Sequence, residues 1–127
     1  MALSSQHRYR AIWQAFLEGQ FILCVSNEIL EEYVEVIGRN ISPHIADMVI
    51  YTLLMRKNIQ RFDPHFRFQL IEADPDDNKF VDCAIVSGAK YIVSEDHHFN
   101  VLQRIDFPKV DVIGIDQFLR DLPSYIK

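Results

Sequence analysis

Four short apolar runs of strand length alternate with helical segments along this chain, and this alternation restricts the fold more than any other feature. The runs are FILCVS at 21–26, IQRF at 59–62, YIVS at 91–94 and VDVIGI at 110–115. Strands joined through helices run parallel, because each crossover returns the chain to the same end of the sheet. Parallel sheets are covered by helices on both faces. The pattern therefore predicts an α/β protein, a three-layer α/β/α sandwich around a parallel sheet.

Capping residues mark the helices of the first half. One helix is expected over 8–18 with Gly19 as its stop, a second after Ser26 or Asn27, and a third from Pro43. In the third helix, the apolar stripe expected to face the core consists of Ile45, Met48, Val49 and Leu53.

The second half has equally clear signals. Asp74 or Asp76 is expected to cap a helix that runs to about Ser87 and stops at Gly88. A short helix comes after YIVS, and Asp116 is expected to cap a last helix. Gly/Ser linkers and repeats are absent, so residues 1–127 are interpreted as a single domain.

Charge and hydropathy narrow the class of protein. The formal net charge is −5 at pH 7, whereas modules that hold nucleic acid by phosphate neutralisation alone are usually basic. A chain of this charge that handles nucleic acid is expected to use a bound cation.

The longest apolar runs are too short to span a membrane. The charged N-terminus, MALSSQHRYR, is unlike a signal peptide, so we expect a cytoplasmic protein. Cys24 and Cys83 are interpreted as buried free thiols.

The stretch DPDDNKF at 74–80 concentrates carboxylates at an expected helix start. Aspartates at the cap and in the first turn suit the positive end of a helix, and this local explanation accounts for one or two of them. Topology offers a second explanation. Asp77 precedes the strand YIVS by one helix, and Asp96 comes after that strand, so both lie on the carboxyl-end side of the sheet.

The helix after FILCVS starts at the same edge and brings Glu28, Glu31 and Glu32. Carboxylates from three segments repel one another unless a cation lies between them, and Mg²⁺ is typically held by a few carboxylates, water and a substrate phosphate. His97 and His98 are interpreted as surface residues, and Asp82 as a residue of the outer helix face or one that supports the site.

Two longer segments, VSNEILEEY and DPDDNKFVDCAIVSGAKYIVSEDHHF, resemble the PIN-domain family, in the branch described as toxin components of toxin–antitoxin pairs. The resemblance runs from about residue 8 to residue 120. It implies a ribonuclease that uses Mg²⁺ or Mn²⁺ at an acidic site, with RNA as substrate, a cognate antitoxin as partner and homo-oligomers. Carried over by motif, Glu32, Asp77 and Asp96 are the expected catalytic and metal-binding residues.

The chain departs from the family pattern at its start. The family opens with an apolar strand that ends in an aspartate and lies between the strands corresponding to FILCVS and YIVS. The segment ALSSQHRYRAIW resembles the part of the pattern that comes directly after that strand. We therefore expect a sheet that lacks its usual first strand and one carboxylate, which puts the activity of this 127-residue form in doubt. The alternative to a nuclease is a non-catalytic binding or regulatory module with the same fold.

Overall fold

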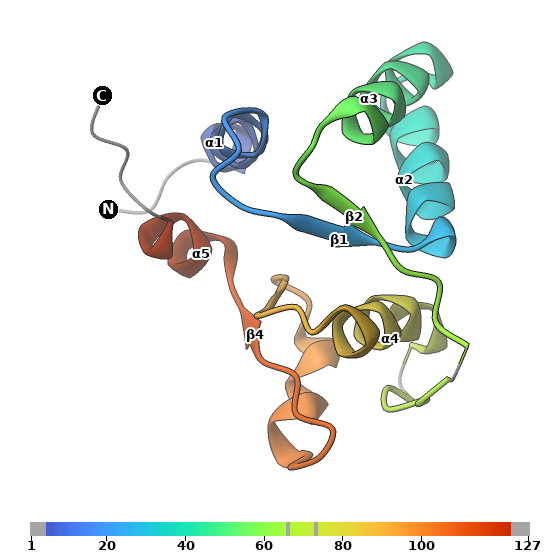
Figure 1. The fold of residues 1–127 in the computed structure, drawn as a ribbon, viewed down its shortest axis with the longest axis vertical. Helices are drawn as coiled ribbons and strands as arrows, with labels where there is room; N and C mark the ends of the chain where they lie inside the picture. The colour runs from blue at the N-terminus through green and yellow to red at the C-terminus, as the bar shows by residue number, and fades with distance from the viewer. Residues whose placement is uncertain (1–4, 66, 73, 123–127) are drawn as a thin grey trace.

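The computed structural model describes residues 5–65, 67–72 and 74–122, and alternates helices with short strands (Figure 1). The elements are, in order, α1 (Ser5–Leu17), β1 (Leu23–Val25), α2 (Asn27–Asn40), α3 (Pro43–Met55), β2 (Ile59–Arg61), η1 (Pro75–Asp77), α4 (Asn78–Ser87), β3 (Ile92–Val93), η2 (His97–Arg104), β4 (Val112–Ile113) and α5 (Ile115–Asp121). Here η denotes a 3₁₀ helix. The predicted α/β class is confirmed.

The strands form two small parallel sheets. β1 pairs with β2, with Leu23 opposite Ile59, and β3 pairs with β4, with Ile92 opposite Val112. Within the described ranges no ladder joins β1 to β3. Parallel pairing is therefore confirmed, whereas a single sheet inside a three-layer sandwich remains a prediction.

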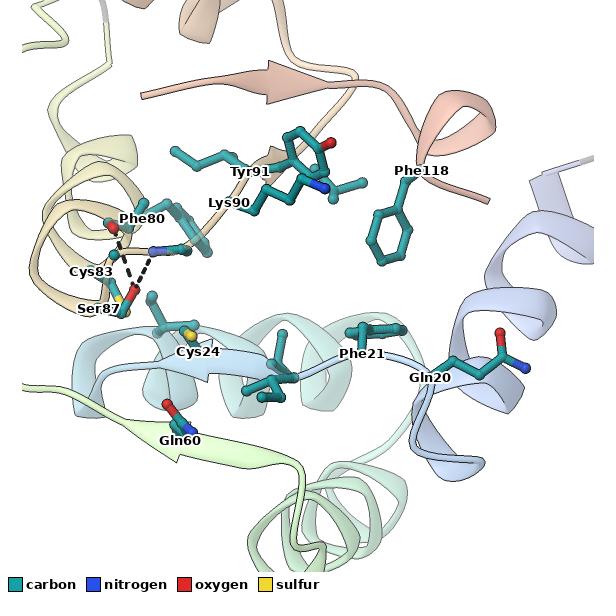
Figure 2. Close-up of a pocket in the computed structure, with 18 of the residues that line it drawn as sticks. Gln20, Phe21, Cys24, Gln60, Phe80, Cys83, Ser87, Lys90, Tyr91 and Phe118 are labelled. Carbon is teal, nitrogen blue, oxygen red and sulfur yellow. Dashed lines mark hydrogen bonds between the residues drawn. The ribbon is translucent and has the colours of Figure 1, made fainter. Parts of the chain in front are cut away.

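A cavity of about 730 Å³ separates β1 from β3 (Figure 2). Its lining includes Phe21 and Cys24 from the β1 segment, Phe80 from α4, Tyr91 beside β3 and Phe118 from α5. Most of the lining side chains are apolar, and they come from both sheets and from the helices α2, α4 and α5. The cavity therefore lies between the two sheets.

Among the residues that the structure describes, β1 and β3 each have one edge without a neighbouring strand. Leu23 N–H and Val25 C=O bond toward β2, so the N–H and C=O of Cys24 point to the opposite side. Ile92 and Ser94 bond toward β4 in the same way, which leaves the groups of Val93 on the other edge. Cys24 and Val93 both line the cavity.

Two apolar clusters make up the core. One lies around α4, β3 and η2 and contains Ile71, Val81, Ala84, Ile92, Phe99, Leu102 and Val110. The other lies around β1, α2 and α3 and contains Phe16, Val25, Ile29, Leu30, Leu53 and Cys83. Phe80 of α4 packs against both clusters, so α4 is the element that joins the two halves.

Helix termini agree with the signals in the sequence. Ser26 and Ser42 cap α2 and α3 by accepting the N–H groups of Ile29 and Ile45. Gly88 ends α4 in the left-handed region at φ 68°, where a side chain would be strained. No helix in the described ranges is long and apolar enough to cross a membrane.

Some expected orientations are wrong. Ile45 and Met48, expected to face the core, are 36% and 54% exposed, whereas Leu53 of the same expected stripe is buried, as is Ala46. Asp82 does not lie on an outer helix face: it is 2% exposed and accepts the N–H of Phe68 at 3.1 Å. Burial raises its pKa above the ordinary carboxyl value.

The cysteines are free thiols, as expected, but only one is fully buried. Cys83 lies in the core, and Cys24 is half-buried beside the cavity. Burial raises the pKa of Cys83 to about 11, with a smaller effect from Cys24. Cys83 therefore stays protonated and unreactive at neutral pH.

Candidate metal centre

The first part of the site is the turn that starts α4. Asp74 accepts the N–H of Asp76 at 3.2 Å, and Pro75 begins the 3₁₀ turn that ends at Asp77. Asn78 then fastens this turn to the preceding loop, because its side chain bonds both the N–H and the C=O of Ile71 at 2.9 Å. Local capping chemistry therefore brings Asp74 and Asp77 to the same side of the turn.

The second part is the segment that comes after β3. The N–H of Asp96 donates to Ser94 Oγ at 2.9 Å, and Asp96 Oδ1 accepts the N–H of His98 at 2.9 Å. Asp96 is thus the N-cap of η2. Ser94 itself is tied to β4 through its N–H, which donates to the C=O of Ile113. Asp96 and His98 therefore stand on a segment that is anchored at both ends.

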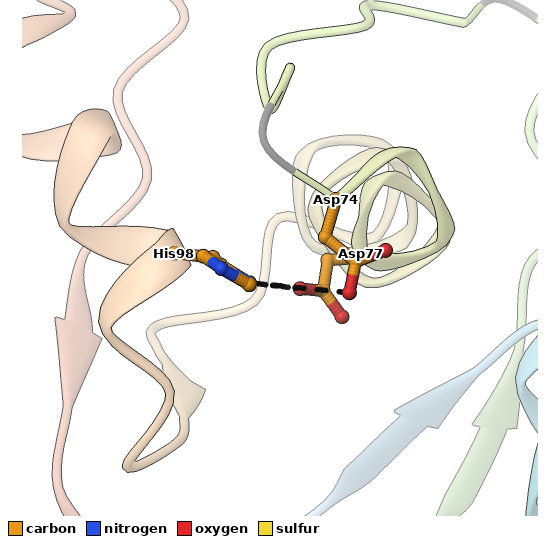
Figure 3. Close-up of side chains that lie close together, drawn as sticks. All are labelled: Asp74, Asp77 and His98. Carbon is orange, nitrogen blue, oxygen red and sulfur yellow. Dashed lines mark ion pairs between the residues drawn. The ribbon is translucent and has the colours of Figure 1, made fainter.

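The two parts meet at the imidazole of His98 (Figure 3). Its Nδ1 lies 3.3 Å from Asp96 Oδ1, 3.5 Å from Asp77 Oδ2 and 3.9 Å from Asp74 Oδ2. Asp74, Asp77 and His98 each offer one ligand atom within 4.8 Å of the others. Two carboxylates and one imidazole nitrogen thus converge on a small volume, and Asp96 approaches the same nitrogen without belonging to this cluster.

Burial makes this convergence electrostatically unfavourable without a cation. The Asp77 side chain is only 16% exposed. Burial raises its pKa above the ordinary carboxyl value, the charges of Asp74 and Asp96 raise it further, and His98 opposes the shift. At 3.5 Å the contact with His98 is too long for a good hydrogen bond. Asp77 Oδ2 and His98 Nδ1 are therefore both buried without a hydrogen-bond partner among the described residues.

Buried polar atoms without partners are the kind that a metal ion satisfies. In an octahedral ion with bonds of about 2.1 Å, adjacent ligand atoms lie about 3.0 Å apart. The separations from His98 Nδ1 to the Asp77 and Asp74 oxygens, 3.5 and 3.9 Å, are slightly wider than this. Small side-chain rotations would close them, so the residues present fit a divalent cation.

Of the three site residues expected from the sequence, two meet here and one does not. Asp77 and Asp96 both contact His98. Glu32 on α2 instead forms an ion pair with Lys79 on α4, at 2.7 Å. Burial lowers the pKa of Lys79, but the hydrogen bond and charge of Glu32 outweigh this effect and raise it overall. Glu32 thus lies next to the start of α4, but its charge is neutralised by the ammonium group of Lys79.

The sequence did not predict His98 as a site residue, and it predicted Asp74 only as a helix cap. Asp74 does cap η1, yet its second oxygen also approaches His98. The available signal for His98 was its place two residues after Asp96, in the first turn of a short helix. A histidine in that position is usually a surface residue, and only the approach of α4 distinguishes His98, at 30% side-chain exposure, from His97, at 83%.

Comparison with known proteins assigns most of this chain to one family. The family model described as the PIN domain matches residues 1–98, a range that includes Glu32, Asp74, Asp77, Asp96 and His98. No curated protein and no solved structure matches the chain.

Proposed function

Because this chain belongs to the PIN-domain family, whose members are generally nucleases, we propose that it is an endoribonuclease that depends on Mg²⁺ or Mn²⁺. The observation that carries the proposal is the convergence of Asp74, Asp77 and Asp96 on His98 Nδ1. Two of the buried atoms there have no hydrogen-bond partner in residues 5–65, 67–72 and 74–122, and a cation between them would satisfy both. The reaction would be hydrolysis of RNA phosphodiesters.

Each residue of the centre has a role that is derived from its contacts. Asp74, Asp77 and His98 would hold the ion, because their ligand atoms already lie within 4.8 Å of one another. Asp96 orients His98 by accepting its backbone N–H, and its other oxygen remains available to the site. The ion, when bound, would polarise a phosphodiester and lower the pKa of a bound water.

Glu32 remains part of the proposal as an outer ligand that acts through water. Its partner Lys79 lies two residues after Asp77, on the first turn of α4. The pair therefore brings one carboxylate and one ammonium group to the rim of the centre. Lys79 would also be available to an RNA phosphate, because an ammonium group binds phosphate as a point charge.

The biological setting is proposed from the resemblance to the toxin branch of the family. We propose that the protein acts in the cytoplasm on RNA, that an antitoxin protein controls it, and that it forms homo-oligomers. The acidic composition, −5 at pH 7, supports a cation-dependent rather than a purely basic mode of RNA binding.

A complete sheet is a further part of the proposal. The open edges of β1 and β3 border the same apolar cavity. We propose that a strand between them joins the two sheets into one three-layer domain and that an aspartate at its end adds a carboxylate to the centre.

The same observation favours the second candidate function, a non-catalytic binding or regulatory module. In the part of the chain that the structure describes, the two sheets are separate and Glu32 is paired with Lys79, so part of the proposed machinery is not assembled there. The two candidates differ in one respect that can be measured, which is metal-dependent cleavage of RNA.

The test combines metal binding with cleavage. Mn²⁺ at about 100 times its Kd should stabilise the wild type by about 2.7 kcal/mol, measured as a rise in Tm. The variant with Asp77→Asn and Asp96→Asn should keep the apo fold but lose both this rise and any metal-dependent cleavage of RNA. Asp106→Asn, an exposed aspartate outside the cluster, is the control.

An unchanged rise in Tm in the double variant would refute the assignment of the centre. Metal binding without cleavage, in this chain and in one with the added strand, would instead favour the non-catalytic module.

A further inference from the structure

We propose that His98 contributes a nitrogen ligand through Nδ1 and that the centre therefore selects Mn²⁺ over Mg²⁺. This inference rests on the proposed function and goes further, because it assigns a nitrogen ligand to the centre and an order of affinity to two ions.

His98 Nδ1 faces the carboxylates of Asp74 and Asp77 (Figure 3). It is buried without a hydrogen-bond partner among the described residues, although three carboxylate oxygens lie 3.3 to 3.9 Å away. The backbone N–H of the same residue is fixed by Asp96 Oδ1 at 2.9 Å. The ring is thus held with one nitrogen directed at Asp77, whose Oδ2 also lacks a partner.

The chemistry of the ligand set then distinguishes the two ions. Mg²⁺ is a hard cation that takes oxygen ligands in near-ideal octahedral geometry and keeps several waters. Imidazole is a common ligand of first-row transition ions, whose affinity for mixed nitrogen and oxygen sites rises from Mn²⁺ toward Zn²⁺. Mn²⁺ belongs to this series and Mg²⁺ does not. A set of two carboxylates and one imidazole therefore favours Mn²⁺, and more strongly the later ions of the series, over Mg²⁺.

The chain carries its own control in the adjacent histidine. His97 has an 83% exposed side chain, and its Nδ1 approaches Asp96 only to 3.9 Å. It does not belong to the cluster of Asp74, Asp77 and His98. A change at His97 therefore alters the histidine content of the segment without removing the proposed nitrogen ligand.

The first measurement is titration calorimetry with Mg²⁺, Mn²⁺ and Zn²⁺ on the apo protein. In the wild type, affinity should rise in that order, with Mn²⁺ binding at least about tenfold more tightly than Mg²⁺. In His98→Asp, which offers oxygen in place of nitrogen, the ratio of Mn²⁺ to Mg²⁺ affinity should fall by about tenfold. His97→Asn should keep the wild-type ratio. A ratio that is equal in all three proteins would overturn the inference.

The second measurement is decided in the wild type, and two variants serve as controls. Electron spin-echo envelope modulation of bound Mn²⁺, in protein labelled with ¹⁵N-histidine, should show coupling to the nitrogens of one imidazole ring. The coupling should persist in His97→Asn and disappear in His98→Asn. Bound Mn²⁺ without nitrogen coupling would refute the inference and leave the nuclease proposal intact. Nitrogen coupling without RNA cleavage in any metal-loaded form would refute the nuclease and leave the assignment of His98 as a ligand intact.

Discussion

Asp77 bears most of the electrostatic strain in the centre. Its carboxylate is largely buried, its pKa is raised by burial and by Asp74 and Asp96, and the opposing contact with His98 at 3.5 Å is too long to relieve it. A group whose pKa is higher in the folded state than in the unfolded chain stabilises the fold in its protonated form. That contribution is lost as the pH rises through the folded-state pKa.

The stability of the metal-free protein should therefore depend on pH through Asp77. The ordinary carboxyl pKa is about 4. As the pH rises from this value through the raised pKa of Asp77, the contribution of Asp77 to the free energy of unfolding should decline. Asp77→Asn should remove this decline and be more stable than the wild type at pH 7 without metal. Urea denaturation between pH 4 and pH 8 measures both the pH dependence of stability and the difference between the two proteins at pH 7. Asp106→Asn is the control. Parallel pH profiles for wild type and Asp77→Asn would contradict the prediction.

Glu32 differs from its neighbouring glutamates in its contacts. It pairs with Lys79 at the start of α4, whereas Glu35 pairs with Arg39 on its own helix. In a form of the chain that cleaves RNA, Glu32→Gln should lower metal-dependent kcat by about tenfold or more, as loss of a supporting ligand does. Glu31→Gln and Glu35→Gln should leave kcat unchanged. If all three variants lose activity equally, the total negative charge of α2 determines kcat, and the assignment of Glu32 as an outer metal ligand is wrong.

At the scale of elements, α5 shows how a helix can be capped from a distance. Its N-cap residue is Gly114, which has no side chain to offer, and the N–H of Ile115 donates to Glu95 Oε1 at 2.8 Å. A Cβ on residue 114 would lie 3.2 Å from that oxygen, so glycine makes room for the carboxylate. Glu95 also lies 3.7 Å from Arg8 of α1. It therefore links three elements next to Asp96.

Removal of this acceptor should destabilise the fold. Glu95→Ala should cost about 1 kcal/mol, the usual value of a helix N-cap, as measured by urea denaturation. Glu95→Gln should cost less, because its amide oxygen still accepts the N–H of Ile115 and the ion pair with Arg8 is half exposed and weak. Glu72→Ala, at an exposed position, is the control. A loss as large in Glu95→Gln as in Glu95→Ala would show that charge, not capping, is what matters.

For the molecule as a whole, the defining feature is that the strands in the described ranges form two separate sheets. The edge groups of Cys24 and Val93 border a cavity of about 730 Å³. Each backbone hydrogen bond formed there would contribute about 0.5–1.5 kcal/mol. Total stabilities are only about 5–15 kcal/mol. A strand that bonds to both edges would therefore change stability by a large fraction of the total.

An added strand should raise stability and activity together. We expect the 127-residue form to cleave RNA weakly or not at all. Extension upstream of Met1 by about five apolar residues that end in aspartate should raise the free energy of unfolding by about 2 kcal/mol or more and increase metal-dependent cleavage. A Gly/Ser extension of the same length is the control. If the 127-residue form cleaves RNA as fast as the extended form, with activity lost in Asp77→Asn, the claim of a missing strand fails.

Much of the element order and half of the centre could be predicted from local chemistry. The serine caps of α2 and α3, the glycine stop of α4 and the parallel strands appear where the sequence predicts them, because each depends on residues a few positions apart. Asp77 and Asp96 were found because they flank one strand at the same end of a parallel sheet. These features reflect backbone hydrogen bonding and side-chain periodicity, which a linear sequence records directly.

The remaining features depend on contacts between distant segments. VDVIGI was expected to be strand through residue 115 with a cap at Asp116, yet α5 begins at Ile115 because Glu95, 20 residues away, supplies the acceptor. His98 belongs to the candidate centre because α4 places Asp77 next to it. Glu32 instead forms an ion pair with Lys79. These contacts depend on which charged groups of different elements lie close together in the fold. Charge interactions act through space rather than along the chain, so a linear sequence does not record them.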